Sequence, residues 1–497
     1  MSSEKSCCQS RCDFVTEQAL KPEGSSLFGC FPEIVSPSQV ETLFGRASLA
    51  MSADGVVLVA GAPNFDVDGS ITDAGAVFVF ERQVSFSSCS TNVSQGKFHL
   101  VQILSLGKTA AENDLFGSAV TISGDGNCIA VSAIGRSVDG NLDAGAVYVY
   151  ERRRCNLVQK CGPVLWKLVQ TITAQKTASS TDCTVVSDVQ TSAQFGMPLA
   201  LSRDGQVLVI ATGFGADQTN PSTGSISVFK NCVPQYCSSA FASSFDRFKF
   251  DQKLDMAQVI SDANNPDITA ETVLNIGLSV ATNGNGSAIA FSGFSATVDN
   301  IPAAGRVFIY QRCKKDGSLQ YLQNLTASQT RIRQGTIFGR SLVFTPCGQY
   351  LAIESARGKI EDFTFGGYVA VFRKNGCIYV QDGNDLGPKV GNENPIGRSL
   401  AISDDACVVA FGLEDTTVSG IPGAGKVDIY VRTLQKESDG NLHTVWSFRQ
   451  SLEEKELVEE GRFGSGLAMD ADGLLLAVAA PGLPGQMVIP ELVTIFS

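Results

Sequence analysis

The chain has 497 residues and a formal net charge of −12. This length exceeds the roughly 250–300 residues at which a single hydrophobic core stops growing, so we expect several domains or a repeat array. The acidic charge argues against a nucleic-acid partner, because phosphate binding requires a basic surface. No apolar run approaches the roughly 20 residues of a transmembrane segment, and the start, MSSEKSCCQS, shows no signal-peptide pattern.

One sequence unit recurs seven times. After a cysteine-containing tail at 1–13 and a predicted strand at 14–20, copies begin near residues 43, 115, 194, 275, 337, 395 and 462. Each copy opens on an aromatic or aliphatic residue and a glycine, as in LFGSAVTISGDGNCIAVSAIG at 115, and continues into an alternating segment such as GAVYVY at 145–150. Alternation with a period of two residues predicts β-strands. The repeated glycine is expected where strands converge and a Cβ would clash; it is Gly45, Gly117, Gly196, Gly277, Gly339, Gly397 and Gly464.

A fourth strand in each unit carries a glutamine. Six copies supply their own, which are Gln102, Gln170, Gln252, Gln323, Gln381 and Gln450. The seventh copy runs out at Ser497 after its third strand, and the segment 14–20, with Gln18, has the missing pattern. We therefore predict an all-β fold over 14–497, a seven-bladed β-propeller of four-stranded antiparallel blades in which the N-terminal strand completes blade 7.

The segments FGSAVTISGDG…AGAVYVYE and FGRASLAMSADGVVLVAGAP resemble the FG-GAP repeat. This repeat forms the blades of the integrin α-subunit propeller and of many bacterial, algal and viral surface proteins. The resemblance implies a propeller that binds other macromolecules, with a protein partner of unknown identity. It favours a surface, extracellular or virion location, although no signal peptide is visible.

Integrin-type blades often hold calcium between strands one and two. Here that connection is a short turn with a single carboxylate, such as Asp54 or Asp125, whereas calcium takes six to eight oxygen ligands. We therefore expect no cofactor from these turns. A weaker calcium candidate is NFDVDGSITD, with alternating oxygen ligands at Asn64, Asp66, Asp68 and Asp73. The alternative for this segment is a polar loop held by Asx turns.

The cysteine pattern leaves the redox compartment open. The count of 15 is odd, so at least one thiol has no intrachain partner. In an oxidising compartment, disulfides could staple two short connections, one between Cys155 and Cys161 and the other between Cys232 and Cys237. Cys128 and Cys407 fall in apolar strand patterns and are interpreted as small buried hydrophobic residues.

Charged residues suggest two features of the propeller surface. Arg46, Arg340 and Arg398 share the position after the repeated glycine and are predicted to ring the channel mouth, unless they pair with the backbone or with carboxylates. Basic residues such as Arg152 and Arg312 follow most third strands, and acidic residues gather in the connections of the other face. This asymmetry predicts a charged docking surface; solvated turn charges are the alternative.

Enzymatic motifs are sparse. The chain has only two histidines, His99 and His443, and it lacks the GxSxG, Walker A and HExxH motifs. Carbohydrate binding is not expected, because Trp166 and Trp446 occupy equivalent strand positions typical of blade packing. The main hypothesis is therefore a non-catalytic binding or structural module. The alternatives are a propeller enzyme with a site in the axial channel and an intracellular scaffold.

Overall fold

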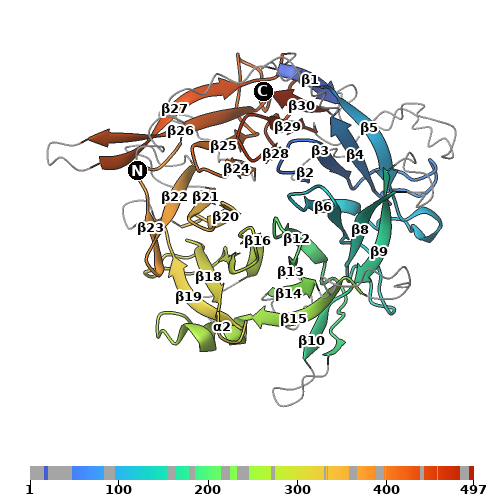
Figure 1. The fold of residues 1–497 in the computed structure, drawn as a ribbon, viewed down its shortest axis with the longest axis horizontal. Coiled ribbons are helices and arrows are strands. Elements are labelled where there is room, and N and C mark those ends of the chain that lie inside the picture. Colours follow the sequence, from blue (N-terminus) through green and yellow to red (C-terminus); the bar gives the residue numbers. More distant parts are fainter. Residues whose placement is uncertain are drawn as a thin grey trace.

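Strand-forming segments follow one another along the whole described chain. The computed structural model describes residues 16–20, 48–82, 96–154, 164–177, 185–213, 224–231, 246–269, 275–328, 332, 334–356, 367–387, 397, 399–436, 442–455, 457–481 and 492–496. These residues form seven four-stranded antiparallel sheets and one two-stranded sheet. Figure 1 shows the seven larger sheets as blades around a central axis. The predicted seven-bladed β-propeller is confirmed.

The first strand of each blade lies nearest the axis, and the fourth lies at the rim (Figure 1). Blade 1 contains β2 (Leu49–Met51), β3 (Val57–Ala62), β4 (Ala76–Arg82) and β5 (Phe98–Leu104). Blade 2 contains β6 (Phe116–Ile122), β7 (Cys128–Ala133), β8 (Ala146–Arg154) and β9 (Val164–Ile172). Blade 3 contains β12 (Phe195–Leu201), β13 (Val207–Thr212), β14 (Ser225–Asn231) and β15 (Phe248–Asp255). Blade 4 contains β16 (Ile276–Thr282), β17 (Ala288–Gly293), β18 (Arg306–Arg312) and β19 (Leu319–Leu325).

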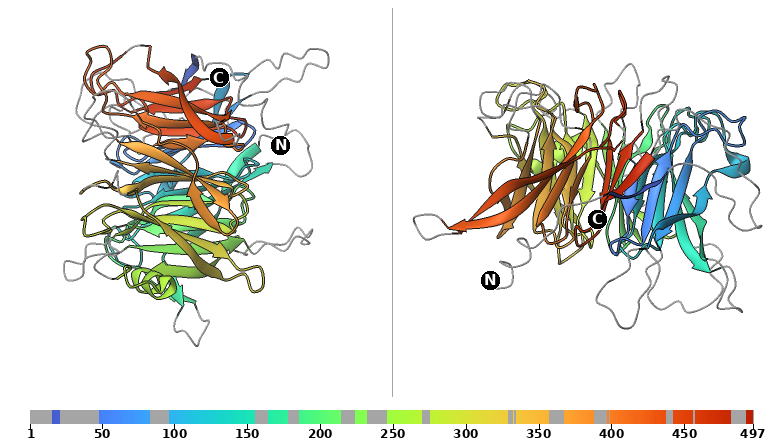
Figure 2. Two further views of the ribbon diagram at one scale, coloured as in Figure 1. Left: turned by 90° about the vertical axis from the view of Figure 1, so that its left-hand side faces the viewer. Right: turned by 90° about the horizontal axis from the view of Figure 1, so that it is seen from above.

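Blades 5 and 6 continue the same order around the ring. Blade 5 contains β20 (Phe338–Phe344), β21 (Tyr350–Ser355), β22 (Tyr368–Asn375) and β23 (Ile378–Gln381). Blade 6 contains β24 (Leu400–Ile402), β25 (Val408–Leu413), β26 (Lys426–Lys436) and β27 (Leu442–Leu452). The hairpin of β26 and β27 extends beyond the rim of the disc (Figures 1 and 2).

Blade 7 joins the two ends of the chain. It contains β28 (Gly466–Met469), β29 (Leu476–Ala480), β30 (Leu492–Phe496) and, as its outer strand, β1 (Thr16–Leu20). β1 pairs antiparallel with β30, with Leu20 opposite Val493 and Gln18 opposite Ile495. The N-terminal strand therefore completes the last sheet. Phe14, where the predicted strand begins, lies outside the described residues.

A few smaller elements decorate the disc. The two-stranded sheet consists of β10 (Gln175–Thr177) and β11 (Val185–Ser187), a 3₁₀ turn spans Gly107–Thr109, and α2 (Met256–Ala263) follows β15. The Asp255 side chain caps α2 by accepting a hydrogen bond from the Gln258 backbone N–H. Within the described ranges, no helix has the length and apolar character needed to cross a membrane.

Apolar contacts between neighbouring blades form the core. The buried apolar residues fall into seven clusters, and each cluster contains side chains from two adjacent blades. The cluster between the last and first blades joins Leu475 and Ala477 to Leu58 and Phe78, so packing also closes the ring. Second strands have neighbours on both faces, which explains their continuous apolar sequences; all six residues of β3 are buried.

Neighbouring blades also make close backbone contacts, as between Ala74–Gly75 of blade 1 and Phe116–Gly117 of blade 2. The Phe116 N–H at the start of β6 donates a 3.0 Å hydrogen bond to the Ala74 carbonyl of blade 1. A Cβ on Gly75 would lie 2.1 Å from the Phe116 carbonyl oxygen, so only glycine fits. The next glycine, Gly117, has φ of +98°. The same backbone bond joins Phe195 to Ala144, Phe338 to Ala304 and Phe463 to Ala424.

Three of the repeated glutamines bind across blade boundaries at the rim. Gln170 of β9 donates from its side-chain amide to the Phe248 carbonyl at 2.8 Å and accepts from the Phe248 N–H at 2.8 Å. Gln102 clamps the backbone of Trp166 in the same way, and Gln323 clamps that of Tyr379. In blade 5, Gln381 bonds within its own blade, and Asn384 clamps Trp446 instead.

We expect Gln170→Leu to lower the free energy of unfolding by about 1–3 kcal/mol, because it leaves a backbone N–H and a carbonyl without partners. Gln381→Leu is the matched control, since its amide lies exposed and bonds to Asp385 of its own blade. This control should change stability by less than about 0.5 kcal/mol. Urea denaturation of both variants measures the difference, and equal effects would show that the clamp contributes nothing.

Candidate functional site

The turns between first and second strands share one hydrogen-bonded geometry. In blade 1, the Ser52 hydroxyl donates to Asp54 at 2.6 Å and accepts from the Val57 N–H at 2.9 Å. Serine and aspartate repeat this arrangement in the SGDG, SRDG and SDDA turns of blades 2, 3 and 6. These side-chain bonds hold each turn rigidly at the inner end of its blade.

The second residue of each turn belongs to a ring of backbone hydrogen bonds around the axis. The Ala53 N–H donates to the Gly124 carbonyl at 2.9 Å, and the Gly124 N–H donates to the Arg203 carbonyl at 2.7 Å. The ring continues from Asp204 to Gly284, from Gly284 to Pro346, from Asp404 to Ala471 and from Ala471 to Ala53. The link from blade 5 to blade 6 cannot form in this way, because Pro346 has no N–H.

Two of these second residues are charged, and they have opposite signs. The other five are Ala53, Gly124, Gly284, Pro346 and Ala471, whereas blade 3 has Arg203 and blade 6 has Asp404. The Arg203 guanidinium forms an ion pair with the Asp404 carboxylate. Blades 3 and 6 are separated by at least two other blades in either direction, so this pair spans the axis. A Cβ on Gly124 would lie 2.3 Å from Arg203 Cγ, so the small neighbour leaves room for the arginine.

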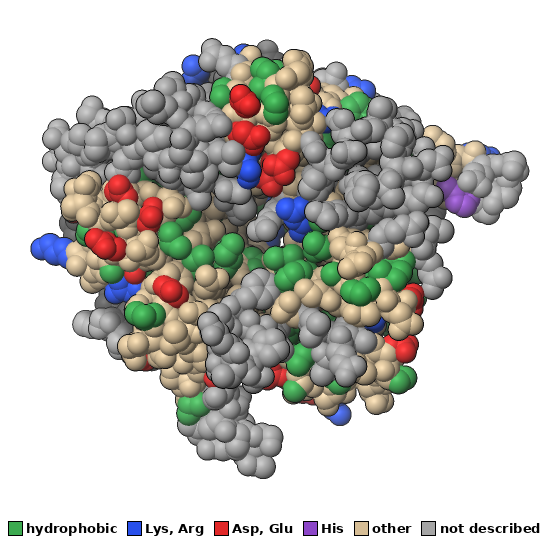
Figure 3. Space-filling view, turned by 180° about the vertical axis from the view of Figure 1, so that it is seen from behind, with side chains coloured by type: hydrophobic (Ala, Val, Ile, Leu, Met, Phe, Trp, Pro, Cys, Tyr) green, Lys and Arg blue, Asp and Glu red, His purple; other side chains and the backbone are tan. Residues whose placement is uncertain are grey.

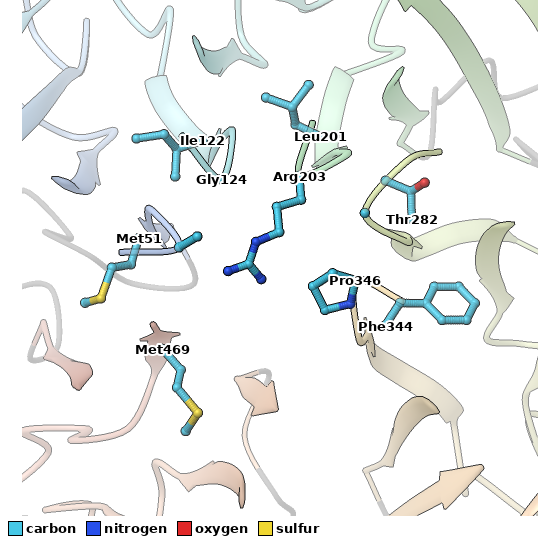
Figure 4. A pocket seen from close by; sticks show the side chains of 11 residues that line it. Met51, Ile122, Gly124, Leu201, Arg203, Thr282, Phe344, Pro346 and Met469 are labelled. Atoms are coloured by element: carbon cyan, nitrogen blue, oxygen red, sulfur yellow. The ribbon is translucent and has the colours of Figure 1, made fainter. Parts of the chain in front are cut away.

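Arg203 also lines a cavity at the inner ends of the blades. The cavity has a volume of about 190 Å³. Its lining includes apolar residues, among them Met51, Ile122, Leu201, Phe344 and Met469, but the surface that it exposes to the cavity is more polar than apolar. Figure 4 shows the Arg203 side chain reaching into the middle of this pocket. We call this space the axial pocket.

The dimensions of the axial pocket limit what it can hold. Its volume is below the roughly 300–1,000 Å³ of most ligand sites. An engineered apolar cavity of about 150 Å³ holds one benzene molecule, so a ligand of roughly six to eight non-hydrogen atoms is a suitable size. A single guanidinium with methionine side chains nearby favours a ligand with one oxygen-rich end and a short apolar body.

The environment of the pair changes the acidity of Asp404. Burial raises the pKa of its carboxyl group, and the Asp472 and Asp405 carboxylates raise it further, while Arg203 lowers it. The net direction is upward. The side chains of Arg203 and Asp404 keep 27% and 37% of their surfaces exposed, so both remain accessible to a ligand.

The predicted arginine ring is a different set from the arginine in the pocket. Arg46 and Arg398 lie outside the described residues. Arg340 is half-buried on β20, an innermost strand, and it does not line the axial pocket. Figure 3 shows Lys or Arg atoms near the middle of the rear face, between hydrophobic atoms. Channel-mouth placement of the three arginines stays a prediction.

The structure gives the candidate metal loop a structural role. The Asn64 side chain donates to Asp73 at 2.9 Å, and the Asp73 N–H donates to Asp66 at 3.0 Å. The loop is closed by a bridge between Val67 and Ile71, and blade 6 forms the same bridge between Val418 and Ile421 in TVSGIPG, which has no carboxylate. Among the described residues, no group of three or more potential ligands is placed to hold a metal ion. We therefore do not carry this metal site forward.

Basic residues after the third strands contact the preceding blade rather than standing free. Arg152 lies over the Trp166 ring at 5.1 Å and pairs with Glu81 of blade 1 at 2.5 Å. Arg312 of blade 4 pairs with Asp251 of blade 3 at 2.8 Å. These cations tie the blade rims together, so the charged docking surface predicted from them is not carried forward.

The cysteines of the described residues differ in state. Cys128, Cys313, Cys347 and Cys377 are free thiols, and burial raises the pKa of Cys128 to about 12. Cys407 is disulfide-bonded, so its interpretation as only a buried hydrophobic residue is wrong. The predicted pairs Cys155–Cys161 and Cys232–Cys237 lie outside the described residues.

One of the seven repeats matches a known protein family. The family described as the FG-GAP repeat matches residues 108–150, which include β6, β7 and the first part of β8. The chain is a β-propeller with an FG-GAP repeat. The integrin-like, adhesion and virion parts of the expectation find no support. No curated protein is significantly similar in sequence to this FG-GAP propeller.

Solved structures share the propeller fold at low sequence identity. A proposed 6-phosphogluconolactonase from Bacteroides fragilis is 14% identical, with a TM-score of 0.42, over 82% of this chain and 87% of its own. A periplasmic gluconolactonase from Pseudomonas aeruginosa is 15% identical, with a TM-score of 0.43, over 82% of this chain and 85% of its own. A proposed 6-phosphogluconolactonase from Bacteroides uniformis is 14% identical, with a TM-score of 0.42, over 82% and 85%.

These findings correct the expected function of the FG-GAP propeller. The similar structures carry the names of enzymes, which contradicts the prediction of a non-catalytic binding module. At 14–15% identity these structures are similar to the chain in fold alone. The FG-GAP motif led to the expectation of adhesion because this repeat occurs in surface proteins. A blade motif specifies the fold, however, and function depends on the residues of the site that the fold carries.

Proposed function

We propose that this FG-GAP propeller is an enzyme that hydrolyses a small ester or lactone in the axial pocket. The observation that carries the proposal is the Arg203–Asp404 pair, which spans the axis beside a small cavity. Ester hydrolysis uses a general base and a fixed positive charge, and this pair brings both to one point.

The chemistry assigns one role to each side chain. The Asp404 carboxylate takes a proton from a water molecule as the water oxygen attacks the carbonyl carbon, and its raised pKa brings it closer to the working range of a general base. The Arg203 guanidinium stabilises the negative charge that develops on the carbonyl oxygen. The carbon–oxygen bond to the leaving group then breaks, and the proton on Asp404 passes to the departing alkoxide. The products are an alcohol and a carboxylic acid, or one hydroxy acid from a lactone, and the acid then releases its proton to solvent.

The walls of the pocket decide which substrates suit this chemistry. The half-buried Met51 and Met469 side chains provide apolar contacts, and the volume of about 190 Å³ suits a small molecule. A six-atom lactone ring or a short-chain ester matches the size of ligand expected above. Larger sugar lactones would not fit without movement of the blades.

The full-length chain should be assayed against short-chain esters and small lactones, the second being the class named for the solved structures above. Arg203→Met and Asp404→Asn should each lower kcat/KM by about 100-fold, as expected for loss of a transition-state charge partner. Arg136→Met is the matched control, because Arg136 forms an ion pair with Asp114 away from the pocket. Thermal melting of all three variants separates lost activity from lost folding.

Two results would overturn the proposal. The first is full activity in both pocket variants, and the second is no turnover of any ester or lactone by the folded wild-type chain. A loss of activity in Arg136→Met equal to that in Arg203→Met would also count against a specific role for the axial pair.

A further inference from the structure

The axial pocket has a cation whose partner can be exchanged. Arg203 is the charged residue among those that line the cavity, whereas Asp404 reaches it from outside the lining. Exposed ion pairs contribute only about 0–1 kcal/mol, so replacing one carboxylate by another on this guanidinium costs little free energy. By contrast, the Asp428 side chain in the pair with Lys426 is only 2% exposed, which leaves no access for a competing anion.

The lining indicates the chemical class of the competing anion. The planar guanidinium fork of Arg203 matches a carboxylate in a two-point contact, and the half-buried Met51 and Met469 side chains can contact a short hydrocarbon body. Inorganic phosphate is compact and strongly hydrated, so it would leave these side chains without an apolar partner. The favoured ligand is therefore a small carboxylate with a short aliphatic body.

We propose that the axial pocket binds a small aliphatic carboxylate, which replaces Asp404 as the partner of Arg203. The inference rests on the proposed axial site but not on hydrolysis, since binding requires only the exchangeable pair. If the chain does hydrolyse esters, this carboxylate is the acid product, and its binding is product inhibition. Release of Asp404 from Arg203 is then part of each turnover.

Protonation of Asp404 should favour the exchange. The charged groups that act on its carboxyl are Arg203 of blade 3, Asp405 of its own turn and Asp472 of blade 7. Once Asp404 takes up a proton, it no longer neutralises Arg203, and the two remaining carboxylates do not form the axial pair. Anion affinity should therefore rise as the pH falls through the raised pKa of Asp404.

Calorimetric titration of the full-length chain with isobutyrate tests the inference. We expect saturable binding of one isobutyrate per chain, no binding of the neutral isostere isobutyramide, and weaker binding of inorganic phosphate. Asp404→Asn should bind isobutyrate about tenfold more tightly, because the guanidinium loses its competitor. Arg203→Met should bind none, while Arg136→Met should bind as the wild type does.

The pH dependence of anion binding is measured with propane-2-sulfonate, because this anion stays charged at every pH used. Its affinity should rise as the pH is lowered from 7 in the wild type and stay constant in Asp404→Asn. Unchanged affinity for isobutyrate in Arg203→Met or weaker affinity in Asp404→Asn would overturn the inference, as would tighter binding of phosphate. Binding without ester hydrolysis would contradict the proposed function alone, and hydrolysis without carboxylate binding would contradict this inference alone.

Discussion

A variant that lacks residues 1–20 should lose about 4 kcal/mol of unfolding free energy, because it lacks the outer strand of blade 7. β1 contributes four paired residues to β30, and a backbone hydrogen bond contributes about 1 kcal/mol. The variant would also leave the edge of β30 open to pairing with another chain. We therefore expect self-association as well as a lower melting temperature.

Addition of a synthetic peptide of residues 11–22 gives this prediction a direct control. The peptide should raise the melting temperature of the shortened chain and reverse its self-association, since it supplies the missing strand. A second variant that lacks only residues 1–10 should melt like the full chain. Closure by β1 would be contradicted by a shortened chain that is monomeric and as stable as the full chain.

Gly145→Ala should destabilise the protein by about 2–5 kcal/mol, from roughly 1–2 kcal/mol of left-handed strain and 1–3 kcal/mol of overpacking. Gly145 precedes β8 with φ of +83°. An added Cβ would lie 2.4 Å from the Phe195 nitrogen and 2.5 Å from its carbonyl oxygen. Because both contacts are with backbone, relief would require blades 2 and 3 to separate.

Gly140→Ala separates the clash from the backbone strain. Gly140 lies in the same connection, has φ of +80° and would bring its Cβ within 4 Å of nothing. This control should cost only the strain of about 1–2 kcal/mol. Urea denaturation of both variants measures the difference, and equal losses would show that the close approach of the two blades is unimportant.

Much of the propeller could be predicted from the sequence, because the information is local and repeated. A period of two residues specifies strands, and seven copies of the same unit specify seven blades. The missing fourth strand of blade 7 indicated how the ring closes. The partners of the glutamines could not be predicted in the same way, since Gln170 clamps Phe248 and the two are 78 residues apart.

The axial site was missed for a geometric reason. Arg46, Arg340 and Arg398 drew attention because arginine recurs at one repeat position. Arg203 and Asp404 differ instead from their repeat equivalents, because the second residue of the turn is alanine, glycine or proline in the other five blades. An alignment of the seven turns contains that signal, but only the ring geometry shows that blades 3 and 6 bring the two charges together across the axis.

The candidate metal loop shows how little the residue pattern of a single copy can discriminate. Alternating oxygen-bearing residues such as Asp66 and Asp68 are typical of calcium ligands, and they are equally typical of turns that hydrogen-bond to themselves. The repeat itself offers a comparison, because blade 6 forms a similar bridge between Val418 and Ile421 in the segment TVSGIPG, which has no carboxylate. Comparison between copies was therefore more informative than the residue pattern of one copy.

A crystal structure of the full-length chain grown with isobutyrate at mildly acidic pH tests the axial site most directly. We predict carboxylate density in the axial pocket, with its oxygens within hydrogen-bond distance of the Arg203 guanidinium, the aliphatic body against Met51 and Met469, and Asp404 displaced. An empty pocket with the Arg203–Asp404 pair intact at saturating isobutyrate would contradict the account.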